Sequence, residues 1–429
     1  MKKKNIFIVG AEKFNLKELE TIENSENYNF ISLMSESEVH RQDVKLDLKA
    51  LLNKARKILD EFDGSIDGII GYYDFPVTLV TFLLINEYNL PGPTLESGIK
   101  CENKYISRKI QSEVIPGHIP DFALVNPFKA EKIEDIDLEP PFWIKPVKAY
   151  SSQIGFRINN QADLDKALPA IRNKIDYFAD PYNFVASFAN LPEDLKCIDG
   201  YHCIAESLIG GHQCTLSGFV HEGNVETYGV VDSINYPDTD SFFYYLFPSR
   251  LPDSVKERLD RIAKKVMPAV GFNNSPFNIE FYYDEQKDDI RLLEINPRMS
   301  QSHSELYNKV AGQSNHQILV QLALGQYPAF KHSDGPFKFS AKLHYRVFHD
   351  GIVKSYPDEE RMKEIRKKFP DMEMKHLVKE GQRLSELRGQ DSYSYRILVV
   401  FLGGDSEKHI LEKYNDYLKE MNIEIEKTG

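Results

Sequence analysis

The stretch FNIEFYYDEQKDDIRLLEINPRMS, residues 277–300, constrains the fold more strongly than any other part of the chain. Apolar and polar residues alternate with period two on both sides of the polar run DEQKDD, which is typical of two strands joined by a turn. We therefore predict an antiparallel hairpin in which Asp284 and Ile290 flank the loop and pair with each other. This register decides which side chains share a face.

In this register two glutamates and two asparagines lie on one face of the hairpin. Glu280 faces Glu294, and Asn278 faces Asn296, while the apolar side chains take the opposite face. Like charges that face each other across a sheet are destabilising, and Mg²⁺, which prefers oxygen ligands, would compensate them. Two alternatives stay open: one glutamate protonates, or the polar face is solvated. A slip of one residue would remove the pairing.

Arg298 lies two residues beyond Asn296 and points to the same side if the strand continues. A guanidinium at this place could hold a carboxylate or a phosphate with two hydrogen bonds. The alternative is an ion pair with Glu280 or Glu294.

The chain has 429 residues, which suggests two or three domains, and its 41% hydrophobic and 28% charged residues are typical of a globular protein. Strand and helix patterns alternate at the start, so we expect an α/β domain with a parallel sheet over residues 1–95. Strands dominate afterwards, and we expect α+β domains over 96–330 and a β-rich C-terminal domain over 335–429.

The formal charge of −12 makes nucleic acid an unexpected partner. The four cysteines form no CxxC pair, as expected for reduced thiols of a cytoplasmic protein. No window reaches the roughly 18 apolar residues that span a bilayer, and the N-terminus lacks the apolar core of a signal peptide. We therefore expect no membrane contact.

The hairpin motif NIEFYYD…IRLLEINPR resembles the closing motif of the ATP-grasp superfamily. Three further segments match in the family's order: ENKYISRKI, FWIKPVKAYSSQIGF and CIAESLIGGHQCTLSGFV. The resemblance covers roughly residues 96–330 and is nearest to the branch that contains biotin carboxylase and the carboxylate–amine ligases. It implies a lid over about 140–205.

The resemblance also assigns roles to individual residues. Lys104 and Lys145 would neutralise the phosphates of ATP, and Arg298 would hold the reacting carboxylate. The other implied contacts are Ser151, Ser152 and Gly155 for the phosphate-covering loop, Glu206, Ser207 and Leu208 for the adenine hinge, and Glu280, Glu294 and Asn296 for Mg²⁺.

The implied reaction is the ATP-dependent activation of a small carboxylate as an acyl phosphate, which an amine then attacks, with release of ADP and phosphate. Three polar residues near the acceptor side, Asp232, Ser233 and Arg250, are candidates for substrate contact, or they are structural. By analogy with the branch, a homodimer is the implied assembly.

Two alternatives to this ligase stay open. The phosphate loop has Tyr150, Ser151 and Ser152 where glycines are common, and Ala205 and Gln213 stand where acidic hinge and ribose partners are common. These departures motivate the alternative of a non-catalytic ATP-binding regulatory module. A bicarbonate-activating enzyme like biotin carboxylase is the third option, although Ser302 replaces the glutamate that such enzymes use as a base.

Overall fold

The computed structural model describes residues 2–39, 46–149, 154–387, 390–391 and 393–428. Its N-terminal part is a parallel sheet of order β2-β1-β3, which confirms the predicted α/β start. β1 runs over Lys4–Ala11, β2 over Tyr28–Ser35 and β3 over Gly68–Gly71. The helices of this part are α1 (Lys13–Glu20), α2 (Glu36–Val39), α3 (Leu48–Asp60) and α4 (Val77–Glu87).

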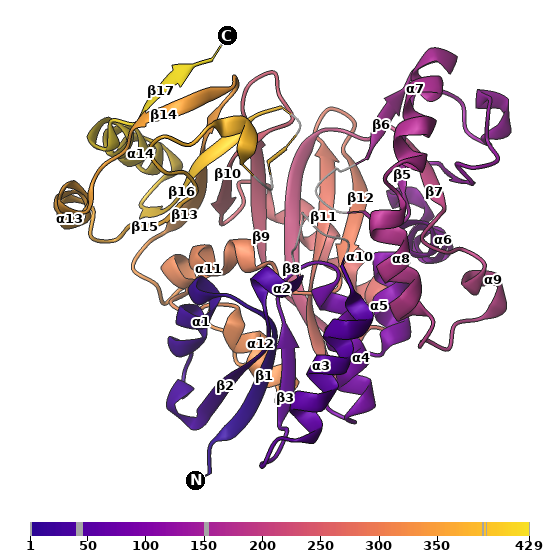
Figure 1. Cartoon of the computed structure of the whole chain (residues 1–429), viewed down its shortest axis with the longest axis horizontal. Coiled ribbons are helices and arrows are strands. Elements are labelled where there is room, and N and C mark those ends of the chain that lie inside the picture. The colour runs from indigo at the N-terminus through magenta and orange to yellow at the C-terminus, as the bar shows by residue number, and fades with distance from the viewer. Residues whose placement is uncertain (1, 40–45, 150–153, 388–389, 392, 429) are drawn as a thin grey trace.

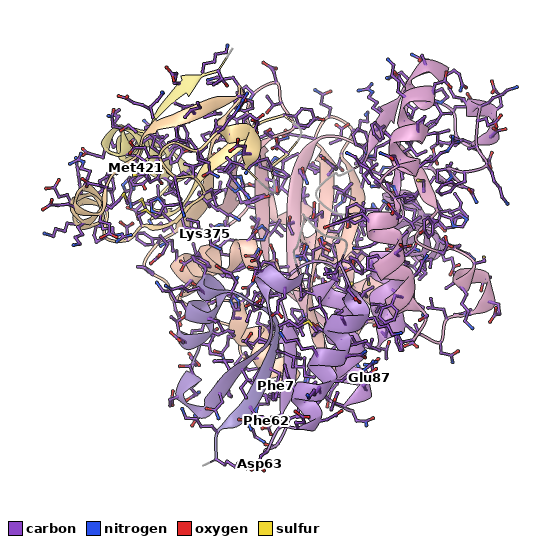
Figure 2. All side chains as sticks on the ribbon, viewed as in Figure 1. Phe7, Phe62, Asp63, Glu87, Lys375 and Met421 are labelled. Atoms are coloured by element: carbon purple, nitrogen blue, oxygen red, sulfur yellow. The ribbon has the colours of Figure 1, made fainter. Side chains whose placement is uncertain are left out.

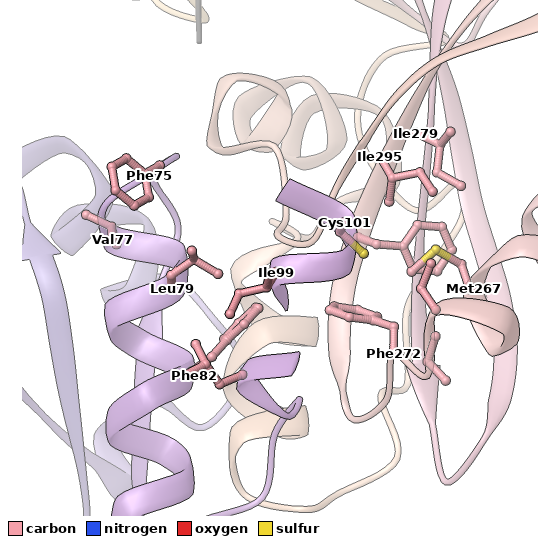
Figure 3. Close-up of a cluster of buried hydrophobic side chains, with 14 of the residues drawn as sticks. Phe75, Val77, Leu79, Phe82, Ile99, Cys101, Met267, Phe272, Ile279 and Ile295 are labelled. Carbon is pink, nitrogen blue, oxygen red and sulfur yellow. The ribbon is translucent and has the colours of Figure 1, made fainter. Parts of the chain in front are cut away.

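An apolar cluster joins this N-terminal part to the rest of the molecule (Figure 3). Phe82 of α4 and Ile99 of α5 (Leu95–Glu102) are buried in one cluster with Phe272, Ile279 and Ile295 of the central region. Because α4 is apolar on all sides, it is buried along most of its length. The N-terminal sheet is thereby held next to the hairpin.

The centre of the molecule is one eight-stranded sheet of order β12-β11-β8-β9-β10-β13-β16-β15 (Figure 1). The strands are β8 (His212–His221), β9 (Asn224–Asn235), β10 (Phe242–Phe247), β11 (Ser275–Asp284), β12 (Asp289–Asn296), β13 (Phe339–Val347), β15 (Glu373–His376) and β16 (Tyr395–Gly404). β10 pairs directly with β13, so the sheet continues across the predicted boundary near residue 335. The domain limits themselves stay a prediction.

Helices cover both faces of this sheet. α10 (Asp253–Val270) packs on the face that carries Leu216 and Ile279. α11 (Ser304–Ala311) and α12 (His316–Ala323) cover part of the other face, next to Val231 and Phe247. The face of α11 and α12 is also the face of Glu280, because Glu280, Thr215 and Val231 are direct partners across three strands. We call it the inner face.

A second, four-stranded sheet of order β4-β7-β5-β6 stands at the side of the central sheet (Figure 1). Its strands are β4 (Phe122–Val125), β5 (Phe142–Pro146), β6 (Phe156–Ile158) and β7 (Cys203–Ser207). The helices around it are α6 (Lys104–Val114), α7 (Gln161–Arg172), α8 (Asp176–Ala186) and α9 (Glu193–Lys196). This region contains the predicted lid.

The C-terminal part adds α13 (Glu359–Lys368), α14 (Glu407–Met421) and the small pair β14 (Gly351–Ser355) and β17 (Glu424–Lys427). Five short 3-10 helices complete the elements: Ser25–Asn27, Pro116–His118, Ile133–Asp135, Gln301–His303 and Leu384–Glu386. Of the helices in the described ranges, none combines the length and apolarity needed to cross a membrane.

Candidate functional site

The predicted polar face of the hairpin is present. Asn278 pairs with Asn296, and Glu280 pairs with Glu294, between β11 and β12. Asn296 Nδ2 donates to Asn278 Oδ1 and to Glu280 Oε1, each at 3.1 Å. The two carboxylates and two amides therefore form one polar group on the inner face.

The turn end of the hairpin differs from the prediction. Asp284 pairs with Asp289, so the predicted pairing of Asp284 with Ile290 is wrong by one residue. A bulge next to Glu280 leaves Leu293 without a partner on β11, and this extra residue restores the predicted register at the glutamates. The Leu293 carbonyl accepts a hydrogen bond from Arg108 Nη2 at 3.0 Å, which gives the bulged backbone a partner.

The donor set of this face fits Mg²⁺. Burial and the facing Glu294 carboxylate raise the pKa of Glu280, whose hydrogen bonds come only from the amides of Asn296 and Gln213 within the described part of the chain. No group of three or more His, Cys, Asp or Glu suited to a metal occurs among the described residues. Mg²⁺ commonly uses one or two carboxylates together with substrate phosphates and water, so two glutamates and an amide suffice.

Lys104 reaches this acidic group from the start of α6. The side chain of Asn103 caps the helix by accepting from the backbone N–H of Ile106 at 3.1 Å. Lys104 Nζ then lies 3.1 Å from Glu294 Oε1 and donates to the Ala149 carbonyl at 2.8 Å. The lysine thus connects β12 with the start of the predicted phosphate loop.

Lys145 of β5 meets Glu206 of β7 on the four-stranded sheet, and Arg108 joins them. Lys145 Nζ lies 2.7 Å from Glu206 Oε2, and Arg108 Nη2 donates to Glu206 Oε1 at 2.6 Å. Burial alone would raise the pKa of Glu206, but the two cations outweigh it and lower the pKa to about 2. Sequence reasoning missed Arg108, although its place one helical turn after Lys104 was a usable signal.

These side chains line one hollow between α6, the four-stranded sheet and β12. The structure therefore brings together Lys104, Lys145, Glu206 and Glu294, four of the residues singled out from the sequence. The remaining lining residues are Cys101, Ser107, Arg108, Gln111, Leu293 and Ile295.

Arg298 directly follows the hairpin and meets the N-terminal part. Its Nη2 donates to Asp74 Oδ2 at 2.9 Å and to Asn296 Oδ1 at 3.3 Å. Asp74 comes just after β3, at the carboxyl edge of the parallel sheet, where ligand-binding residues of such sheets gather. The cations of Arg298 and Lys148 outweigh the effect of burial and lower the pKa of Asp74.

Lys148 extends this contact into a buried ionic network. It is 1% exposed, forms an ion pair with Glu102 of α5, and lies 3.6 Å from Asp74 Oδ1. Sequence reasoning missed Asp74, Glu102 and Lys148, since nothing in their local patterns indicates that three distant segments meet.

The predicted loop and hinge residues are placed only in part. Ser151 and Ser152 lie outside the described residues. Gly155 lies against Trp143, because a Cβ at this glycine would be 2.7 Å from Trp143 Nε1. In the hinge, Ser207 Oγ accepts from the backbone N–H of Asp121 at 3.0 Å, and the Leu208 side chain is exposed.

The three predicted substrate contacts separate onto two faces. Ser233 pairs with Gln213 and Tyr245 on the inner face. Asp232, one residue earlier, points to the face of α10, where it accepts from the backbone N–H of Arg250 at 2.8 Å and contacts His212 Nε2 at 2.8 Å. The structure thus brings Ser233 to the site but not Asp232 or Arg250, and it favours a structural role for Asp232.

The chain is similar in sequence to known proteins. Residues 138–305 match the ATP-grasp domain family. The chain is 20% identical over 334 residues to urea amidolyase of Saccharomyces cerevisiae, a match that covers 76% of this chain but 16% of the relative's length.

Two solved structures share the fold along nearly the whole chain. The L-amino acid ligase of Bacillus licheniformis has a TM-score of 0.73 at 16% identity, with 100% of both chains covered. Biotin carboxylase of Campylobacter jejuni, solved as a β-γ-ATP complex, has a TM-score of 0.62 at 16% identity and covers 99% of this chain and 92% of its own. The predicted fold class and the resemblance to this superfamily are confirmed.

Proposed function

Because residues 138–305 match the ATP-grasp domain family, we propose that the chain is a Mg²⁺- and ATP-dependent ligase. It would activate a small carboxylic acid as an acyl phosphate, which an amine attacks, with release of ADP and phosphate. The observation that carries the proposal is the pairing of Glu280 with Glu294 beside Lys104. The ligases among the similar folds support the same reaction class.

The nucleotide side would use cations that already line the hollow. Lys104 and Lys145 each hold one carboxylate at about hydrogen-bond distance, and phosphate oxygens could share or replace these contacts. Bound Mg²⁺, held by Glu280, Glu294 and Asn296, would offset charge on the transferred phosphoryl group. The chain's own contribution is positioning and charge neutralisation.

Arg298 is the proposed anchor of the carboxylic acid. Asp74 holds one end of its guanidinium, while Nε has no hydrogen-bond partner among the described residues and Nη1 makes only a 3.4 Å contact with the Met299 carbonyl. The group therefore keeps donors for an incoming carboxylate.

The test measures ADP release from ATP and Mg²⁺ with hydroxylamine present, across a panel of amino acids and other small carboxylic acids. Hydroxylamine intercepts an acyl phosphate, so the amine need not be known. Acid-dependent ADP release is expected, and Glu294→Gln should abolish it while the circular dichroism spectrum stays unchanged. Glu285→Gln, at an exposed position in the loop of the same hairpin, is the matched control.

An active Glu294→Gln protein would overturn this assignment. Silence of the wild type across the panel, with MgADP binding confirmed by calorimetry, would instead favour the nucleotide-binding module.

A further inference from the structure

A buried lysine without an acidic partner lies on the inner face of the central sheet, away from the hairpin. Lys342 of β13 is 8% exposed and pairs with Tyr245 on one side and with Phe401 on the other. Its Nζ lies 5.6 Å and 5.7 Å from the centroids of these two rings. Among the described residues Lys342 forms no ion pair, and a buried ammonium group without one is costly.

The neighbours of Lys342 add donors rather than acids. His344, two residues further along β13, is 2% exposed, and neither ring nitrogen has a hydrogen-bond partner in the described ranges. The same holds for Nε of Arg396 on β16. Burial and then the charge of Arg396 lower the pKa of Lys342, and burial with the charges of Lys342 and Arg396 lowers the pKa of His344. Lys375 of β15, labelled in Figure 2, pairs with Val399 of β16, which also pairs with His344. Its Nζ lies 3.7 Å from the centroid of the Phe14 ring of α1.

The acids that approach this cluster are engaged or distant. Asp391 lies 2.6 Å from Arg346 and accepts further hydrogen bonds from Ser394. Glu12 offsets part of the charge of Lys375. No carboxylate of the described residues forms an ion pair with Lys342 or Arg396. Lys342 and His344, with the partly buried Arg396, therefore form a set of hydrogen-bond donors that has no acidic partner in the described part of the chain.

His303 connects this cluster with the proposed reaction site. The Tyr245 ring lies 5.3 Å from His303 and 5.5 Å from His344, between centroids. Burial, together with the charges of Lys342 and Arg298, lowers the pKa of His303 to about 3. His303 is thus electrostatically coupled to both Lys342 and Arg298.

Resting on the proposed ligase function, we propose that one substrate carries an anionic group, a carboxylate or a phosphate, which Lys342 and Arg396 bind at the end remote from Arg298. Such an anion would favour the protonated form of Lys342 and would accept the charge-assisted hydrogen bonds that the described residues do not offer to Lys342 and to Nε of Arg396. His344 offers a further donor to the same oxygen atoms. We therefore expect the acid or the amine that is the substrate to carry an additional negative charge.

The first experiment measures the melting temperature with inorganic phosphate or succinate, each against sodium chloride of matched ionic strength. Saturating MgADP is present throughout, so that the nucleotide site does not bind the probe. We expect phosphate or succinate to raise the melting temperature of the wild type. Lys342→Met should weaken the apparent affinity for the anion by about tenfold or more.

Lys413→Met is the matched control for this experiment. Lys413 is another partly buried lysine of the C-terminal part, but it has an acidic partner, Asp371, at 2.6 Å. Its variant should keep the anion response. A response to succinate alone would identify a carboxylate, and a response to phosphate alone a phosphate; a wild type that responds to neither overturns the inference.

The second experiment compares the melting temperatures of the wild type, Lys342→Met and Lys413→Met without any added anion. Lys342→Met should raise the melting temperature, because it removes a buried polar amine for which the described residues supply no acidic partner, whereas Lys413→Met should lower it by breaking an ion pair. If Lys342→Met lowers the melting temperature and leaves the anion response intact, the lysine is structural and the inference fails.

The two proposals fail in different ways. Unchanged MgADP binding by Lys342→Met is expected, and a wild type that binds no MgADP would contradict the ligase proposal. If instead the ligase turns over a substrate without an additional anionic group, with a KM that Lys342→Met leaves unchanged, only the anion site is refuted.

Discussion

Arg298 and Asp74 are joined by a 2.9 Å hydrogen bond although 224 positions separate them in the chain. The bond connects a residue that follows the β11–β12 hairpin with the carboxyl edge of the N-terminal sheet. The proposed carboxylate anchor is therefore oriented by a part of the chain that lies outside the matched ATP-grasp residues 138–305.

Asp74→Asn should destabilise the protein by about 1–3 kcal/mol, because the buried Arg298 and Lys148 both lose a charged partner. Urea denaturation at neutral pH measures this change. Asp63→Asn, at an exposed position of the same N-terminal part, is the control and should stay within about 0.5 kcal/mol of the wild type. Equal urea midpoints for Asp74→Asn and Asp63→Asn would contradict a stabilising role of the ionic network.

Glu280→Gln should raise the melting temperature in EDTA, because it removes one of two facing carboxylates. The same variant should lose the stabilisation that Mg²⁺ together with ADP gives the wild type. Glu294→Gln should lower the melting temperature in EDTA instead, since it breaks the contact with Lys104. Calorimetry with and without Mg²⁺ distinguishes the variants, and a lower stability for both would argue against a metal face.

Lys104→Met should weaken MgADP binding by about tenfold or more, as expected when one charged contact to a phosphate is lost. Lys109→Met is a matched control, because Lys109 lies on the same helix but pairs with the exposed Asp194. Isothermal titration calorimetry measures both. Comparable losses in the two variants would mean that the effect is not specific to the hollow.

The acid stability of the fold should depend on Glu206. Its pKa falls from an ordinary 4.5 to about 2, so its contribution is fully present above about pH 4.5 and is lost as the pH falls towards 2. The shift corresponds to roughly 3 kcal/mol. In Glu206→Gln the free energy of unfolding should therefore fall less steeply between pH 4.5 and pH 3, measured by urea titrations. If the free energy of unfolding of Glu206→Gln falls as steeply with pH as that of the wild type, Glu206 is not the source of the acid sensitivity.

The hairpin shows how far alternation along one segment can predict a site. The pairing of Glu280 with Glu294 followed from period two alone, and the error at Asp284 came from a bulge that sequence alternation does not reveal. The parallel N-terminal sheet was equally accessible, since its apolar pattern is local.

Contacts between distant segments could not be predicted in this way. Asp74, Lys148 and Arg298 come from three regions, and only the folded chain brings them together. Lys342 is a comparable case, because a lysine in a strand normally indicates a solvated face. Its burial results from the rings of Tyr245 and Phe401, which belong to two other strands.

The direct pairing of β10 with β13 has a consequence for how this chain can be divided. Removing everything after residue 335 would leave β10 as a new edge strand, with a row of backbone N–H and C=O groups open to pairing with other molecules. The last part of the chain therefore completes the sheet to which β10 belongs. Shortened versions that end there should be recovered mainly as aggregates, and functional dissection of this protein is better done by point substitution than by truncation.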